Sequence, residues 1–125
     1  MTLSAPPPCS GATRVIFIVG DPVAQVLAPV GLTERFRQRG ADLIVVPAHV
    51  AAADFAVFVA TARRMQNCDG LIVTVPHKFS ARRLCETATQ RATRVGSVNL
   101  MRRNDSGGWF GAMTDGEGLL KTIRL

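Results

Sequence analysis

The chain of 125 residues has no tyrosine and a single tryptophan, and aromatic residues account for 6% of it. Its six phenylalanines fall at spacings typical of a core, so few rings are available on which bases could stack. Fifteen basic against nine acidic residues give a formal charge of +6, but the arginines are dispersed, mostly over segments expected to form solvent faces of helices. We therefore expect a generally basic surface and no nucleic-acid partner.

Long apolar runs and paired cysteines are missing as well. No apolar run approaches the ~20 residues of a membrane-spanning helix, so we expect no membrane contact. Cys9, Cys68 and Cys85 are odd in number and show no C-x-x-C spacing, which is typical of reduced thiols. Residues 1–12 contain three consecutive prolines and no apolar segment of signal-peptide length, and we expect a disordered lead-in there. Together these features favour a cytoplasmic protein.

Motifs that bind phosphates or metals are also absent. No G-x-G-x-x-G follows a predicted strand and no G-x-x-x-x-G-K-S/T occurs, so we expect this chain to bind no nucleotide cofactor by itself. His49 and His77 have no partner at metal-ligand spacing, which argues against a zinc site. Cys68 and Cys85 lie where small buried residues are ordinary, and a nucleophilic Cys–His pair stays open as an alternative.

The apolar pattern predicts one α/β domain over residues 13–125. Apolar residues make up 47% of the chain and charged residues 19%, which is typical of a globular domain. Apolar runs at 14–19, 43–46 and 70–75 each end at a glycine or proline turn, and helical spacing occupies 29–39 and 55–65. Successive units of this kind predict parallel strands that helices cover on both faces.

The second half of the chain departs from this repeat. A basic stretch over 77–93 predicts a helix, and short strands at 98–102 and 109–113 flank a hairpin-like turn at 104–108. A further helix is expected from Asp115 onward. The predicted fold is thus a three-layer α/β domain with a mostly parallel mixed sheet flanked by helices.

Polar residues follow several of the predicted strands. Thr74 and Lys78 lie in VTVPHK at 73–78, Asn99 ends GSVN at 96–99, and Asp115 lies in GAMTDG at 111–116. Because ligands of open α/β sheets bind beyond the carboxyl ends of the strands, we expect these four side chains to converge on one crevice.

These motifs, together with GDPVAQVLAP at 20–29 and TDGEG at 114–118, resemble those of the shikimate dehydrogenases and their quinate-using relatives. The resemblance runs from about residue 14 to the C-terminus, with the motifs in the family's order and spacing. It implies the fold of that family's N-terminal substrate-binding domain. A separate Rossmann domain, in cis or in trans, would bring NADP or NAD, and no metal is implied.

The resemblance also implies the roles of the four polar residues. Lys78 and Asp115 would be the catalytic pair for reversible reduction of 3-dehydroshikimate to shikimate, a step of aromatic amino acid biosynthesis. Lys78 would donate the proton that the new alkoxide needs, and Asp115 would orient Lys78. Thr74 and Asn99 would hydrogen-bond the substrate. Without a cofactor domain, the chain is expected to be inactive.

Several positions depart from the family's pattern. The family's Ser-x-Ser-Pro, whose hydroxyls hold the substrate carboxylate, is replaced by a segment with Val26 and Ala28 at the two serine positions. A hydrogen bond to a charged group is worth roughly 1.5–3 kcal/mol, so this loss would weaken carboxylate binding by several hundredfold or more. Ile72 stands where the family usually has Asn, and Gln25 where His is common.

Three interpretations follow. The first is the substrate-binding portion of a shikimate-dehydrogenase-like enzyme, acting on a shikimate-like cyclic polyol. The second is a relative that acts on a different, less acidic cyclic polyol or ketone, as Val26 and Ala28 suggest. The third is a non-catalytic module that binds a small molecule. The sequence does not choose between NADP and NAD.

Overall fold

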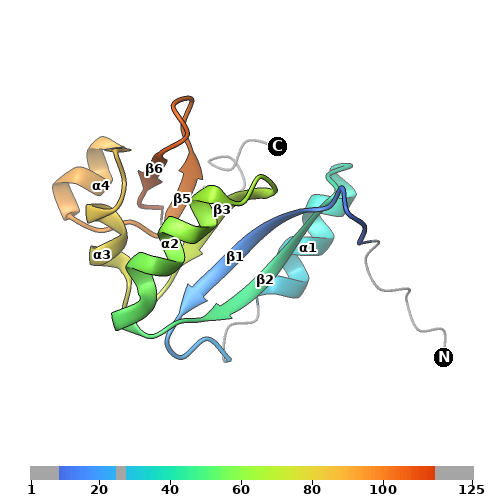
Figure 1. Cartoon of the computed structure of the whole chain (residues 1–125), viewed down its shortest axis with the longest axis horizontal. Coiled ribbons are helices and arrows are strands. Elements are labelled where there is room, and N and C mark those ends of the chain that lie inside the picture. Colours follow the sequence, from blue (N-terminus) through green and yellow to red (C-terminus); the bar gives the residue numbers. More distant parts are fainter. Residues whose placement is uncertain (1–8, 25–27, 115–125) are drawn as a thin grey trace.

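The computed structural model describes residues 9–24 and 28–114 and places them in one layered α/β unit (Figure 1). The elements, in chain order, are β1 (Arg14–Gly20), α1 (Ala28–Gln38), β2 (Leu43–His49), the 3-10 turn η1 (Ala52–Asp54), α2 (Phe55–Arg64), β3 (Cys68–Val73), α3 (Lys78–Arg83), β4 (Thr87–Ala88), α4 (Gln90–Val95), β5 (Leu100–Arg103) and β6 (Trp109–Ala112). Within the described ranges, no helix combines the length and apolar character that crossing a bilayer requires.

The six strands form a single mixed sheet in the order β2-β1-β3-β5-β6-β4. Strand β1 pairs in parallel with β2 and β3, and β4 pairs in parallel with β6. Strand β5 runs antiparallel to β3, and it runs antiparallel to β6 because the hairpin at 104–108 reverses the chain between them. The predicted mixed α/β sheet flanked by helices is confirmed.

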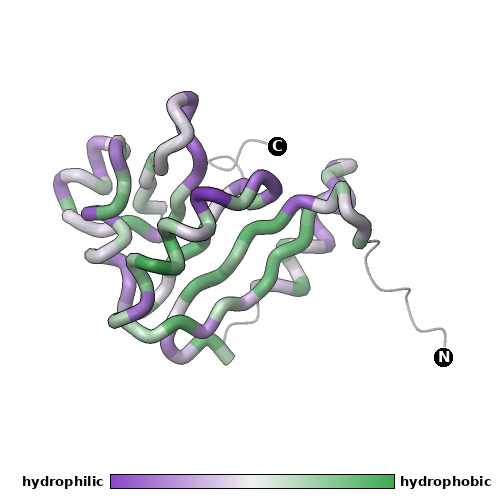
Figure 2. The backbone as a smooth tube through the Cα atoms, in the orientation of Figure 1, coloured by the Kyte–Doolittle hydropathy of each residue, from purple (hydrophilic) through white to green (hydrophobic). Residues whose placement is uncertain are grey.

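Strand β1 is apolar after Arg14 because both of its faces are buried there. Val15 and Val19 belong to the core under α2, α3 and α4, while Ile16 and Ile18 belong to a second core under α1. Alternate residues of a strand point to opposite faces, so the run of five apolar residues at 15–19 serves two helical layers. Figure 2 shows this as a continuous hydrophobic trace along β1 and much of β2.

The prediction of a single helix over residues 77–93 is wrong. Helix α3 ends at Arg83, and α4 begins only at Gln90. Between them the backbone turns to the sheet: Glu86 N donates to Trp109 O at 3.0 Å and Thr89 N donates to Gly111 O at 2.9 Å. Pairing with β6 therefore outweighs local helix formation here, and the short strand β4 results. The helix expected from Asp115 and residues 1–8 of the lead-in lie outside the described residues.

The described cysteines differ in their surroundings. Cys68 and Cys85 are buried and Cys9 is exposed. Burial raises the pKa of the Cys68 thiol, and it raises the pKa of Cys85 to about 11. Because the thiolate is the nucleophilic form, this burial disfavours a nucleophilic role for both cysteines.

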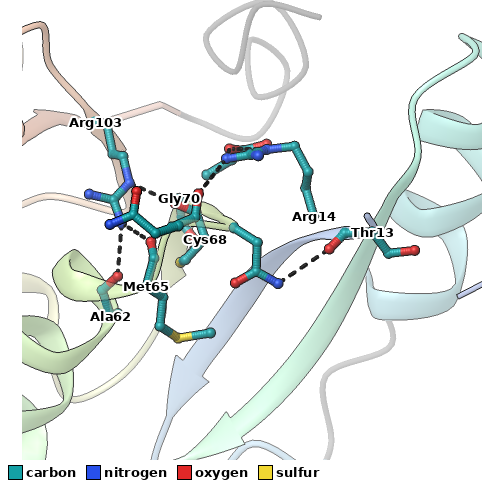
Figure 3. Close-up of polar contacts among 10 residues, drawn as sticks. Thr13, Arg14, Ala62, Met65, Cys68, Gly70 and Arg103 are labelled. Atoms are coloured by element: carbon teal, nitrogen blue, oxygen red, sulfur yellow. Dashed lines mark hydrogen bonds and ion pairs between the residues drawn. The ribbon is translucent and has the colours of Figure 1, made fainter. Parts of the chain in front are cut away.

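Arg103 joins three segments at the end of the sheet where β3 begins (Figure 3). Its Nε donates to Cys68 O at 2.8 Å, and one terminal nitrogen donates to Ala62 O at 3.0 Å and to Met65 O. The last carbonyls of a helix have no partner within the helix, so Arg103 caps α2 and ties it to β3. Sequence analysis placed this arginine among a dispersed surface charge and missed this role.

Replacing Arg103 with glutamine should lower the free energy of unfolding by about 2–4 kcal/mol, because buried carbonyls lose a charged donor. Urea unfolding followed by circular dichroism measures the change. Arg64→Gln is the matched control: Arg64 lies in the last turn of the same helix, is exposed, and should cost about 0.5 kcal/mol or less. Equal losses in the two variants would contradict the capping role.

Candidate active site

The carboxyl ends of β1 and β3 meet at one edge of the sheet. Beyond that edge, Thr74 N donates to Val19 O at 2.9 Å, and Asp21 N donates to Val75 O at 3.0 Å. The two turns that follow the strands are therefore hydrogen-bonded to each other. This edge is where ligands of open α/β sheets bind.

Gly20 allows these two turns to approach closely. A Cβ at this position would overlap the Cγ2 methyl of Thr74 and would lie 3.3 Å from Pro22 O. The methyl group of Thr74 therefore faces Gly20. Its hydroxyl makes no hydrogen bond with any residue in 9–24 or 28–114 and is available to a ligand.

His77 anchors the start of α3, just before Lys78. The imidazole is 1% exposed and stacks on Phe55 with ring centroids 4.3 Å apart. Its Nε2 lies 2.7 Å from Val50 O, and because a carbonyl only accepts, Nε2 carries the proton. Sequence analysis considered this histidine as a metal ligand and left a Cys–His pair open, but it assigned the residue no positioning role. Its position directly before Lys78 was the available signal for a positioning role.

Lys78 begins α3 and is half-buried. Its carbonyl accepts from Val98 N at 3.0 Å, so the helix start is tied to the segment that leads to Asn99. The ammonium group makes no ion pair or hydrogen bond with the part of the chain that the structure describes. The structure thus brings the backbone of Thr74, Lys78 and Asn99 to the same edge of the sheet.

Asn99 holds the chain just before Asp115. Its Nδ2 donates to Thr114 O at 2.6 Å, and its Oδ1 accepts from Thr114 N at 3.0 Å. Asn99 O also accepts from Val73 N at 2.8 Å, which joins β3 to this residue. The side-chain amide is therefore already engaged with Thr114. Asp115 itself lies outside the described residues.

The positions that depart from the family pattern are described only in part. Val26 lies outside the described residues, and Ala28 is the first residue of α1. Ile72 is half-buried and packs against the apolar core under α1. An apolar side chain therefore stands at the position where the family usually has an amide.

A further polar pair, which sequence analysis missed, lies beside this edge. His49 ends β2 and Asp21 follows β1, and His49 Nε2 lies 2.6 Å from Asp21 Oδ1. Both side chains are partly exposed. The signal was available, because a polar residue follows each of two adjacent parallel strands. In the described part of the chain, no three His, Cys, Asp or Glu residues gather as a metal site would require.

A six-stranded mixed sheet with polar side chains beyond its strand ends defines the chain as an α/β domain of the open-sheet class, in which small molecules ordinarily bind at that edge. The family model of the shikimate dehydrogenase substrate binding domain matches residues 18–101. The chain belongs to this family, which confirms the resemblance in its motifs.

Individual relatives agree with this assignment. The shikimate dehydrogenase (NADP(+)) of Synechococcus sp. (strain JA-3-3Ab) is 36% identical over 114 residues, which are 91% of this chain and 39% of that protein. The structure of shikimate 5-dehydrogenase from Listeria monocytogenes, in complex with shikimate and NAD, matches with a TM-score of 0.80 and 27% identity, over 91% of this chain and 39% of that one.

The same fold occurs in 5-ketofructose reductase of Gluconobacter sp. strain CHM43, with a TM-score of 0.80 and 22% identity over 91% of this chain and 40% of that chain. This likeness shows the fold alone. The chain spans about two fifths of the length of the curated shikimate dehydrogenases that it matches.

Gly20→Ala should displace Thr74 and lower the free energy of unfolding by about 1–3 kcal/mol, because a new methyl group must fit against packed neighbours. Gly11→Ala is the control, since a Cβ there meets nothing within 4 Å. Urea unfolding compares the two. If Gly20→Ala is as stable as Gly11→Ala, the close approach of the two turns does not constrain this edge.

Proposed function

We propose that this chain is the substrate-binding half of an NADP-dependent oxidoreductase that interconverts 3-dehydroshikimate and shikimate. Residues 13–125 would form the substrate-binding domain. One observation carries the proposal. The Thr74 hydroxyl and the Lys78 ammonium lie at the same edge of the sheet, and neither has a partner among the described residues. Half-buried polar groups without protein partners, gathered in one place, are typical of a ligand site.

The residues of this chain do not fit a nicotinamide cofactor, since the sequence has no glycine-rich phosphate loop. We assign that cofactor, whose reduced nicotinamide would supply the hydride, to a separate Rossmann domain. Val75 and Phe79 support a covering partner, because these apolar side chains beside Lys78 are 64% and 62% exposed.

The step left to this chain is the proton transfer. Reduction of a ring ketone leaves an alkoxide, and the Lys78 ammonium would give it one proton and become an amine. Asp115 would orient Lys78 and accept a hydrogen bond from a substrate hydroxyl. Asn99 supports this role because it holds Thr114, the residue before Asp115, by two hydrogen bonds of 2.6 and 3.0 Å.

Thr74 and Asn99 would contact the ring hydroxyls. The Thr74 hydroxyl, which has no partner among the described residues, would serve this purpose. The Thr74 methyl group faces Gly20. The Asn99 amide is engaged with Thr114. A hydrogen bond to the substrate would therefore use the second N–H of Asn99 Nδ2 or the second lone pair of Oδ1.

Lys78→Met should lower kcat for shikimate oxidation by about 10²–10⁴-fold and leave KM within about threefold, since the proton transfer is lost and binding is kept. The measurement uses residues 1–125 fused to the cofactor-binding remainder of the Synechococcus relative, with that relative as the positive control. A fusion that binds shikimate but never turns it over would favour a non-catalytic binding module. Unchanged kcat in Lys78→Met would remove Lys78 from the mechanism.

A second candidate is a relative that acts on a less acidic cyclic polyol or ketone. Val26 and Ala28 favour it, because neither side chain can hydrogen-bond a substrate carboxylate. Ile72 favours it as well, since it offers only apolar contact beside Thr74. The fold and the proton donor would be the same in both candidates.

The double substitution Val26→Ser with Ala28→Ser should tighten shikimate binding by about tenfold or more, because two hydroxyls regain contact with a charged group. Isothermal titration calorimetry on the chain measures the affinity. The methyl ester of shikimate is the matched control, and its affinity should stay unchanged. Tight binding by the natural chain with no gain in the double variant would show that the carboxylate is held by other groups.

A further inference from the structure

Strand β2 is one edge of the sheet, since β1 pairs with it on one side and no described strand lies on the other. The hydrogen bonds at its two ends show which backbone groups face β1. Arg14 N donates to Asp42 O at 2.9 Å, and Val50 N donates to Gly20 O at 3.1 Å. Because the N–H and C=O groups of successive strand residues point to opposite sides, the odd-numbered residues from 43 to 49 face outward. Such a row of backbone groups is a template for another strand.

One of the outward donors is satisfied from within the chain. Val45 N donates to the hydroxyl oxygen of Thr33 at 3.0 Å, and this hydrogen bond is buried. Thr33 lies in α1 and is 7% exposed. A threonine in a helix commonly bonds a carbonyl of its own helix, as Thr61 does with Val57 O at 2.9 Å. The Thr33 hydroxyl accepts from the edge strand, so α1 occupies a donor that a neighbouring strand would need.

The next outward position has no donor at all. Pro47 is exposed, and proline carries no backbone N–H. The outward donors that remain on β2 are those of Leu43 and His49, which are about 20 Å apart in an extended strand. A second strand needs donors at alternate residues to form a regular ladder. In the centre of β2 it would meet only carbonyl groups.

The sequence of β2 makes an open edge a hazard. Residues 43–46 are one leucine and three β-branched apolar residues without a charge, which is typical of segments that stack into intermolecular sheets. Strand β2 has seven residues, whereas β4 at the other edge has two. Long apolar edge strands are sites of association unless they are blocked or covered. The need for closure is therefore greatest at the edge where Thr33 and Pro47 lie.

We propose that Thr33 and Pro47 close the free edge of β2 to strand addition, so that a second copy of the chain cannot extend the sheet there. Thr33 removes one donor by bonding it, and Pro47 removes the next because it has none. Neither residue belongs to the candidate active site, and the inference holds whatever small molecule binds there. A strand that paired with this edge would have to displace Thr33 and would still lack the donor at residue 47.

Amide hydrogen exchange, measured by NMR on the natural chain, tests the closure by Thr33. After correction for intrinsic rates, the Val45 amide should exchange at least about tenfold more slowly than the outward-facing amide of His49. Thr33→Ser keeps an accepting hydroxyl and should keep this protection. Thr33→Val replaces the hydroxyl with a methyl group and should lose it. Exchange of Val45 as fast as that of His49 in the natural chain would overturn the proposal.

The double substitution Thr33→Val with Pro47→Ala tests the consequence for assembly. It frees the Val45 donor and adds one at residue 47 without adding apolar surface. Self-association, measured by analytical ultracentrifugation, should become at least about tenfold tighter than in the natural chain. The Val45 amide should then regain protection as the protein concentration rises.

Thr61→Val on the exposed surface of α2 is the matched control, and it should associate no more than the natural chain. Circular dichroism verifies that the variants are folded. Should the double variant not fold, the exchange rates of the natural chain decide by themselves. A folded double variant that associates no more than Thr61→Val would contradict the proposal. A natural chain whose outward β2 amides gain protection with concentration would do so too, because it would show that the edge is open.

Discussion

The close approach of the turn after β1 to the turn after β3 is the constraint on which the candidate site depends. Gly20 permits it, and the hydrogen bond from Thr74 N to Val19 O at 2.9 Å holds it. The methyl group of Thr74 occupies the space that a side chain at position 20 would need, and its hydroxyl has no partner among the described residues. The same edge positions Lys78 through His77, whose ring is fixed by Phe55 and Val50.

The two ends of the sheet differ in how their polar groups are satisfied. Where β3 begins, Arg103, Arg14 and Asn67 are engaged by carbonyls and by Asp69 (Figure 3). Where β3 ends, the Thr74 hydroxyl and Lys78 ammonium have no described partner. Engaged groups stabilise a fold, whereas available groups bind ligands. The indole N–H of Trp109, which is buried and has no described partner, is an exception at the stabilised end.

Much of the fold could be predicted because strand and helix periodicity is a local property. The runs at 14–19, 43–46 and 70–75 each form a strand, and the hairpin at 104–108 lies where expected. Thr74, Lys78 and Asn99 lie at one end of the sheet because β3 ends there and β5, which is antiparallel to β3, begins there. Their roles at a site stay predictions. The prediction of one helix over 77–93 was wrong because Thr87 and Ala88, in the middle of this range, pair with β6, which follows more than twenty residues later.

Local patterning thus determined the apolar strands, the turns that end them and the polar residues placed after them, since each depends on neighbours within a few residues. Tertiary structure decided which polar groups are used. Arg103 meets Ala62 across 41 positions and His77 meets Val50 across 27, and no short-range pattern encodes such pairs. Only the packed sheet shows that the Lys78 ammonium and the Thr74 hydroxyl are left without described partners, because burial and hydrogen bonding depend on every element around them.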